Sequence, residues 1–124
     1  MPLKTLDDKV VAITGAGSGI GRELALRAAR GGALLALSDW NEVSLAETVR
    51  SAREVGGHVS SQVLDVSDRT AMADWAADVV AQHGRVEMVV NNAGVTLTGD
   101  IVDLAYDDID WILGINLGGV INGT

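Results

Sequence analysis

A glycine-rich segment, Thr14-Gly-Ala-Gly-Ser-Gly-Ile-Gly21, has the residue types and spacing needed to bind phosphate. It follows a short apolar run at residues 10–13 and precedes a stretch with a helical pattern. Such a turn presents backbone N–H groups to phosphate oxygens, and the helix N-terminus adds roughly half a positive charge. Gly15, Gly19 and Gly21 would allow a tight turn, a close backbone contact and packing of the helix on the strand. The segment predicts a dinucleotide pyrophosphate site, with an ordinary flexible turn as the alternative.

Two polar side chains near this turn could contact the same ligand. Asp39 follows the next apolar run, about as far along the chain as the acidic residue that meets the adenosine ribose hydroxyls. It could instead cap the helix that begins near Asn41. Because no arginine lies between Ser38 and Asn41 to receive a 2′-phosphate, this stretch favours NAD over NADP. Ser18 could bond a phosphate oxygen or only shape the turn.

A further segment, Asn91-Asn-Ala-Gly94, ends an apolar run at residues 86–90. Together with Thr14-Gly-x-x-x-Gly-x-Gly21, at this separation, it resembles the short-chain dehydrogenase/reductase family. The resemblance extends to Asp65-Val66 and to Asn116, and it covers essentially the whole chain. It implies an oxidoreductase that transfers hydride between a nicotinamide cofactor, here NAD, and an alcohol or ketone.

The resemblance also implies roles for individual residues. The residues implied to bind the cofactor are Thr14, Gly15, Ser18, Gly19, Ile20, Gly21, Asp39, Asp65, Val66, Asn92, Ala93 and Gly94. Asp65 would lie beside the adenine amino group, or it would cap the strand end at Ser67. Asn92 would meet the cofactor ribose, although a buried asparagine could also brace neighbouring strands. Asn116 would be a catalytic residue that holds a proton-relay water, or only a polar helix residue.

The catalytic motif of the family has no match in this chain. Full-length members carry a catalytic Ser and a Tyr-x-x-x-Lys motif, whereas the only tyrosine here, Tyr106, is followed by Asp110 at the lysine position. The sequence also has no cysteine and no metal-ligand spacing, so no metal site is expected. The 124-residue chain is therefore predicted to be inactive alone. It would be the cofactor-binding part of an oxidoreductase, a non-catalytic dinucleotide-binding module, or an inactive truncated fragment that self-associates.

The charge and hydropathy of the sequence exclude two classes of binding partner, nucleic acids and membranes. The formal net charge of −8 and the isoelectric point near 4.4 argue against binding to nucleic acid or an anionic membrane. The longest uncharged segment, residues 112–124, is too short and too rich in Gly and Asn to cross a bilayer. A cytoplasmic protein is the resulting expectation.

The alternation of apolar runs with helical patterns predicts an α/β fold. The expected strands are Lys9–Thr14, Ala33–Ser38, His58–Leu64 and Arg85–Val90, and the expected helices are Ile20–Arg30, Asn41–Val55 and Ser67–His83. Asn41 and Ser67 are the expected N-caps. This order predicts one partial Rossmann-like domain over residues 1–124, with a doubly wound parallel sheet of strand order 3-2-1-4 that stops before a fifth strand.

After this sheet, Leu97–Asp103 is expected to be a loop and Tyr106–Thr124 a helix weakened by glycines. The apolar last strand would leave an open edge, since only Glu87 interrupts it. Open edges of this kind favour pairing with another chain, so a homo-oligomer is expected.

Overall fold

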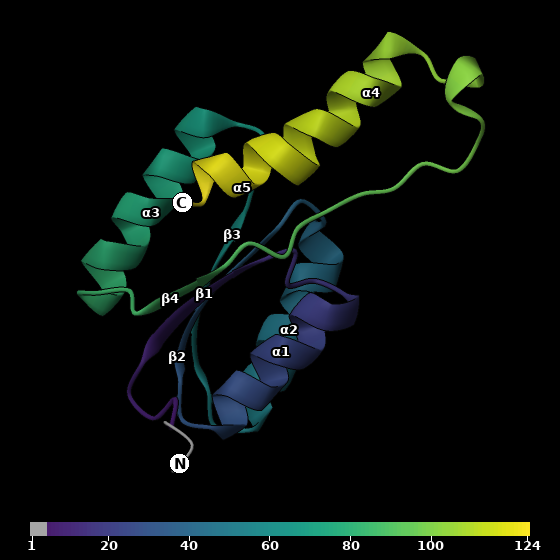
Figure 1. Cartoon of the computed structure of the whole chain (residues 1–124). Coiled ribbons are helices and arrows are strands. Elements are labelled where there is room, and N and C mark those ends of the chain that lie inside the picture. Colours follow the sequence, from purple (N-terminus) through teal and green to yellow (C-terminus); the bar gives the residue numbers. More distant parts are fainter. Residues whose placement is uncertain (1–4) are drawn as a thin grey trace.

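The computed structural model describes residues 5–124, so the first four residues of the predicted domain lie outside the described range. Strands and helices alternate along the chain (Figure 1). The strands are β1 (Val10–Thr14), β2 (Leu34–Asp39), β3 (His58–Val63) and β4 (Met88–Val90). The α-helices are α1 (Gly19–Arg30), α2 (Glu42–Glu54), α3 (Arg69–His83), α4 (Tyr106–Leu113) and α5 (Gly119–Asn122). The 3-10 helix η1 is Ile101–Asp103, and the π-helix η2 is Gly114–Gly118.

The four strands form one parallel sheet in the order β3-β2-β1-β4, which confirms the predicted Rossmann-like topology. In this register Val11 pairs with Leu35 of β2 and with Met88 of β4. Helices α1 and α2 cover one face of the sheet, and α3 and α5 lie on the other (Figure 1). The carboxyl ends of all four strands therefore meet at one edge.

Helices on both faces explain why β1 is apolar from Val10 to Ile13. Val11 and Ile13 pack into the core beneath α1 and α2, whereas Val10 and Ala12 pack into the core that contains Trp75 of α3. All five residues of the strand are buried. A parallel strand buried on two faces has no alternating polar side, which is the continuous apolar pattern that the sequence shows.

The helix starts confirm one predicted cap and correct the other. Asn41 caps α2, because its side chain accepts a hydrogen bond from the Ser44 N–H at 2.9 Å. Ser67 is wrong as the cap of α3, since Asp68 takes that position and accepts from the Ala71 N–H at 3.0 Å. Ser67 instead belongs to the turn that precedes the helix. Both residues have short polar side chains, so local sequence could not choose between them.

The C-terminal region is more irregular than the predicted single helix. The expected loop contains η1, and the expected helix is divided into α4, the π-helix η2 and α5. Figure 1 shows α4 and the loop before it extending away from the sheet. A Cβ at Gly119 would lie 2.5 Å from Val66 Cγ2, so this glycine lets α5 approach the turn between β3 and α3 closely. Within residues 5–124, no helix combines the length and the apolar character that a membrane span needs.

Strand β4 is shorter than the predicted Arg85–Val90, because a side chain replaces its first backbone hydrogen bond. Glu87 Oε2 accepts a hydrogen bond from the Val10 N–H at 2.6 Å, while the Glu87 N–H donates to the Val10 carbonyl at 3.1 Å. Arg85 Nε donates to the other carboxylate oxygen of Glu87 at 2.5 Å. The strand ladder therefore begins only at Met88.

This arrangement predicts a pH-dependent contribution of Glu87 to stability. The Val10 N–H bonded to its carboxylate, aided by Arg85, lowers the pKa of Glu87 below its ordinary value of 4.5. The contribution is therefore complete above pH 4.5 and is lost as the pH falls through the lower folded-state pKa. Glu87→Gln should lower the melting temperature at pH 7 and flatten its decline in acid. Thermal unfolding followed by circular dichroism measures this, with Glu54→Gln as the control; parallel melting curves for Glu87→Gln and wild type would contradict it.

Candidate functional site

A pocket of about 560 Å³ opens at the carboxyl ends of the strands. Parallel α/β sheets bind ligands at this edge, in the crevice where the strand order reverses. All the predicted cofactor residues except Thr14 and Gly21 line it, namely Gly15, Ser18, Gly19, Ile20, Asp39, Asp65, Val66, Asn92, Ala93 and Gly94. The fold therefore brings four separate chain segments to one cavity.

Thr14 and Gly21 do not line this pocket, but both are buried and hold together the segments that form it. Thr14 is buried, and its hydroxyl oxygen accepts hydrogen bonds from the backbone N–H groups of Asn92 and Ala93, each at 3.0 Å. A Cβ at Gly21 would stand 2.2 Å from the Gly15 carbonyl oxygen. The two residues thus allow the glycine turn, helix α1 and the end of β4 to pack together.

The Asn92 side chain braces β1 against β4, one of the two roles considered for it. Its Nδ2 donates to the carbonyl of Thr14 at 3.0 Å and to that of Gly15 at 3.2 Å. Gly15 has φ +64°, and a Cβ there would lie 2.8 Å from Ala93 Cα. Because these contacts hold the ends of β1 and β4 together, the backbone of Ala93 and Gly94 is fixed in position where it lines the pocket.

The glycine turn ends in a helix N-terminus that is open to a ligand. Ser18 is extended (φ −155°) and its side chain makes no cap hydrogen bond to α1. The first N–H groups of a helix have no carbonyl partner within it, and the first turn of α1 carries no acidic residue. Ile20 beside them is 79% exposed. This geometry fits a phosphate group bound through backbone N–H groups.

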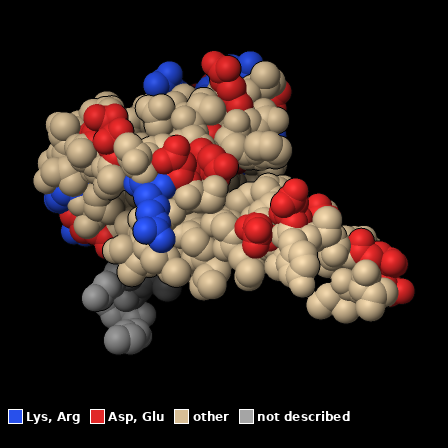
Figure 2. All heavy atoms as spheres, turned by 90° about the horizontal axis from the view of Figure 1, so that it is seen from above, with Lys and Arg blue, Asp and Glu red and all other residues tan. Residues whose placement is uncertain are grey.

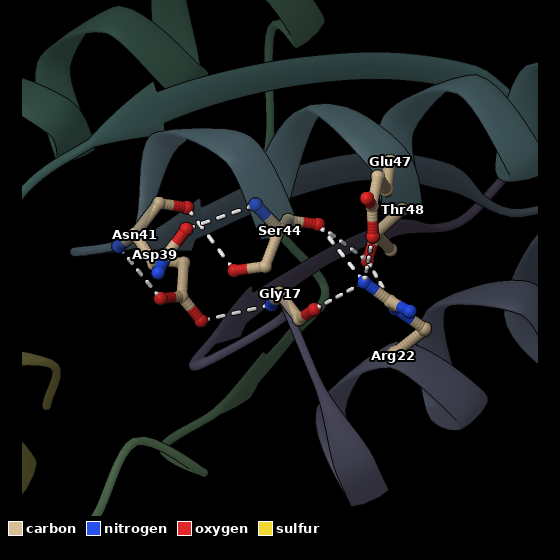
Figure 3. Close-up of polar contacts among 7 residues, drawn as sticks. All are labelled: Gly17, Arg22, Asp39, Asn41, Ser44, Glu47 and Thr48. Atoms are coloured by element: carbon tan, nitrogen blue, oxygen red, sulfur yellow. Dashed lines mark hydrogen bonds and ion pairs between the residues drawn. The ribbon is translucent and has the colours of Figure 1, made fainter.

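Asp39 is buried to 8% exposure at the end of β2, and backbone N–H groups hold its carboxylate (Figure 3). Oδ2 accepts from the Gly17 N–H at 2.8 Å and Oδ1 accepts from the Asn41 N–H at 2.9 Å. Since Asn41 is the cap of α2, Asp39 is not. A carboxylate has about four acceptor sites, so this one retains capacity for ligand hydroxyl groups in the pocket.

Asp65 and Val66 form the pocket wall after β3. Asp65 Oδ1 accepts hydrogen bonds from the backbone N–H of Ser67 at 2.8 Å and from its hydroxyl at 2.7 Å. The local turn considered for Asp65 is thus present, and the same residue also lines the pocket. Val66 is buried beside it and presents an apolar surface.

Asn116 lies in the π-helix η2 and binds the chain segment that leaves β4. Its Oδ1 accepts from the Val95 N–H and its Nδ2 donates to the Val95 carbonyl, both at 2.8 Å. Asn116 is not among the pocket-lining residues, whereas its neighbour Ile115 and Val95 itself are. The paired amide therefore fixes the position of one pocket wall.

Sequence reasoning missed two residues of the glycine turn and its surroundings, Gly17 and Arg22. The Gly17 N–H binds Asp39, and its carbonyl accepts from Arg22 Nη2 at 2.6 Å. One signal was available, because Arg22 places a cation in the first turn of α1, where the helix dipole disfavours it. In residues 5–124, no cluster of His, Cys, Asp or Glu is suited to hold a metal ion.

Charge on this side of the molecule is predominantly acidic. Figure 2 shows acidic side chains spread over the face seen from above and along the part that projects from it, which is α4 and the loop before it. Basic side chains appear there in a few places. An anionic ligand is therefore favoured only where backbone N–H groups create a local positive field, as they do at the glycine turn.

The family model described as short chain dehydrogenase matches residues 9–124. The chain belongs to this family. The protein named "Probable oxidoreductase EphD" of Mycobacterium tuberculosis is 46% identical over 116 residues, which cover 94% of this chain and 20% of that protein. The matched range contains the glycine turn, Asp39, the Asn91–Gly94 segment and Asn116.

Solved structures of the family have the same fold. A short-chain dehydrogenase/reductase of Burkholderia phymatum in complex with NAD is 37% identical with a TM-score of 0.94, over 98% of this chain and 43% of that one. NAD⁺-bound xylitol dehydrogenase is 35% identical with a TM-score of 0.91, over 96% of this chain and 46% of that one. The chain thus spans less than half the length of each of these relatives.

The packing of Gly21 predicts opposite effects for two glycine substitutions. Gly21→Ala should lower the free energy of unfolding by about 1–3 kcal/mol, because the new methyl group collides with the Gly15 carbonyl and the Asn92 side chain. Gly118→Ala is the matched control, since its Cβ would meet only the Leu113 carbonyl oxygen at 3.7 Å. It should stabilise the chain by about 0.5–1 kcal/mol. Urea unfolding measures both, and a shift of the two variants in the same direction would contradict the packing argument.

Proposed function

We propose that this chain is the NAD-binding portion of a short-chain oxidoreductase that transfers hydride between NAD and an alcohol or ketone. The observation that carries the proposal is the position of the buried Asp39 carboxylate, which lies in one pocket with the open N-terminus of α1. This pairs an acceptor for ribose hydroxyls with donors for phosphate. The NAD complexes of two relatives with the same fold support it.

The pocket offers a separate surface for each part of the dinucleotide. The pyrophosphate would lie on the N–H groups of residues 18–20, and the adenosine ribose would lie against Asp39. Trp40, Asp65 and Val66 line the same cavity and would contact the adenine ring. The nicotinamide half would lie toward Ala93 and the residues that follow β4. Bound NAD would supply the hydride acceptor, while these residues bind and orient it.

Asp39 also carries our proposal that NAD is preferred over NADP. A 2′-phosphate on the adenosine ribose would face the carboxylate at close range, and like charges held together are unfavourable. Trp40 and Asn41, which follow Asp39, provide no positive charge to offset this repulsion. The preference therefore follows from charge rather than from a difference in shape.

Isothermal titration calorimetry with NAD and NADP tests this proposal. The wild-type chain should bind NAD at least about tenfold more tightly than NADP because of the repulsion at Asp39. Asp39→Asn loses the charge and keeps an acceptor oxygen for one of the two N–H groups that the carboxylate binds, those of Gly17 and Asn41, so the ratio should fall toward one. Asp74→Asn, an exposed position of α3, is the control and should retain the wild-type ratio. Equal affinities for both dinucleotides in the wild type, with Asp39→Ala neutral, would remove the proposal.

We propose further that this chain alone does not catalyse hydride transfer. Tyr106 is 84% exposed at the start of α4 and is not among the residues lining the pocket, and Asp110 follows where a lysine would be needed. General acid–base catalysis typically contributes about 10²–10⁴ in rate, and here its residues are missing. In the calorimetry samples, a simple alcohol should therefore yield no NADH at an enzyme-like rate, and adding a family-like second half should restore turnover.

We also propose that the chain self-associates through β4. Within the described residues β4 has only β1 as a strand neighbour, and Met88 and Val89 are 45% and 46% exposed. An apolar strand with unpaired N–H and C=O groups favours pairing with another strand. Leu113 and Leu117 of the C-terminal helices are also exposed and could pack on a second copy.

Sedimentation equilibrium of two valine variants tests this association. Val89→Lys should shift the chain toward monomer, because it places a charge on the open edge. Val80→Lys is the matched control, since Val80 is 52% exposed on α3 rather than on the open strand, and should leave the association unchanged. A wild-type chain that remains monomeric at high concentration would contradict the proposal.

A further inference from the structure

Residue Gly17 is held from two sides by side chains of opposite charge (Figure 3). Its N–H donates to Asp39 Oδ2 at 2.8 Å, and its carbonyl accepts from Arg22 Nη2 at 2.6 Å. Its α-carbon also packs tightly, because a Cβ there would lie 2.5 Å from Ser44 Oγ. The middle of the glycine turn is therefore docked on the start of α2.

The guanidinium of Arg22 makes this docking rigid by binding α2 at three further points. Nε donates to Thr48 Oγ1 at 3.0 Å, and Nη2 donates to the Ser44 carbonyl at 3.2 Å and to Glu47 Oε2 at 3.1 Å. Thr48 is fully buried. A planar guanidinium holds several acceptors in fixed directions, which the single ammonium of a lysine cannot do.

Arg22 lies near the N-terminus of α1, where a positive charge is unfavourable unless other contacts compensate for it. A cation in the first turn of a helix is disfavoured by the helix dipole. The acceptors on Gly17 and α2 compensate for this cost, because hydrogen bonds to a charged donor are roughly twice as strong as neutral ones. Arg27 on the same helix is different, since among residues 5–124 its side chain forms only an exposed pair with Glu23, four residues earlier.

We propose that Arg22 is a positioning residue for the dinucleotide, and this inference rests on the proposed function. By holding the Gly17 carbonyl against α2, it directs the N–H groups of residues 18–20 at the pyrophosphate. It also keeps the Gly17 N–H on Asp39, so that the carboxylate stays aimed into the pocket. The proposed pyrophosphate site and ribose site are thus joined by one side chain that is not itself among the residues lining the pocket.

Amide hydrogen exchange in the nucleotide-free chain tests the positioning directly. Arg22→Met should speed exchange of the Gly17 N–H about ten- to hundredfold, because removing a charged hydrogen bond frees the turn. Arg22→Lys keeps the positive charge but loses the planar guanidinium with its several donors, and it should give an intermediate exchange rate. Arg27→Met is the matched control and should leave the rate unchanged. Amides of β1 and β2 report whether the sheet is intact, since a general loss of folding would speed them as well.

Calorimetry with NAD then tests the consequence for binding. Arg22→Met should weaken NAD binding about tenfold or more, with partial recovery in Arg22→Lys and none of this loss in Arg27→Met. Equal Gly17 exchange rates in Arg22→Met and Arg27→Met would overturn the inference, as would equal NAD affinities in these two variants. A wild-type chain that binds no NAD overturns the proposed function instead, while the exchange comparison still decides whether Arg22 orders the turn.

Discussion

The junction between the ends of β1 and β4 is the constraint on which the pocket depends. Thr14 and Asn92 are 78 residues apart in sequence, yet a side chain of each binds the backbone of the other's strand end. Thr14 is buried and both hydrogen bonds are partly buried, and losing one partner of such a bond is costly. This junction fixes the point at which the glycine turn leaves the sheet, and therefore the direction of α1.

A second constraint connects ligand recognition to the structure of the turn. Asp39 is the residue proposed to recognise the ribose, and the same carboxylate holds the Gly17 and Asn41 N–H groups. A substitution that removes the carboxylate therefore changes specificity and loosens the turn together. Asparagine separates the two effects only in part, because it removes the charge and retains an acceptor for just one of the two N–H groups.

Much of the fold could be predicted from sequence, because its signals are local and repeated. The apolar runs, the helical patterns between them and the glycine spacing from Gly15 to Gly21 indicated the strand order and the placement of the pocket. The caps were less certain, since Ser67 and Asp68 are both able to cap a helix. Ten of the twelve predicted cofactor residues line one pocket, whereas Thr14, Gly21 and Asn116 are not among the residues that line it.

The contacts that could not be predicted are those between distant residues. Nothing in the sequence near Arg22 shows that its guanidinium binds Thr48, because that contact exists only once α1 and α2 pack together. The replacement of a strand hydrogen bond by the Glu87 carboxylate depends in the same way on the register of β4 against β1. Sequence patterns report which face of an element is buried, but not which polar side chain reaches across to another element.

At Val95, the backbone anchors the C-terminal helix through Asn116, and the residue also lines the pocket. The anchor therefore does not depend on which side chain lies at this position. Asn116 holds Val95 only through its backbone N–H and carbonyl, while the Val95 side chain remains in the pocket wall. Any amino acid except proline offers the same backbone groups. Position 95 is therefore open to variation in size and polarity while the helix that follows keeps its anchor. In evolution or in design, such a position allows the shape of the cavity to diverge without a matching change in the scaffold.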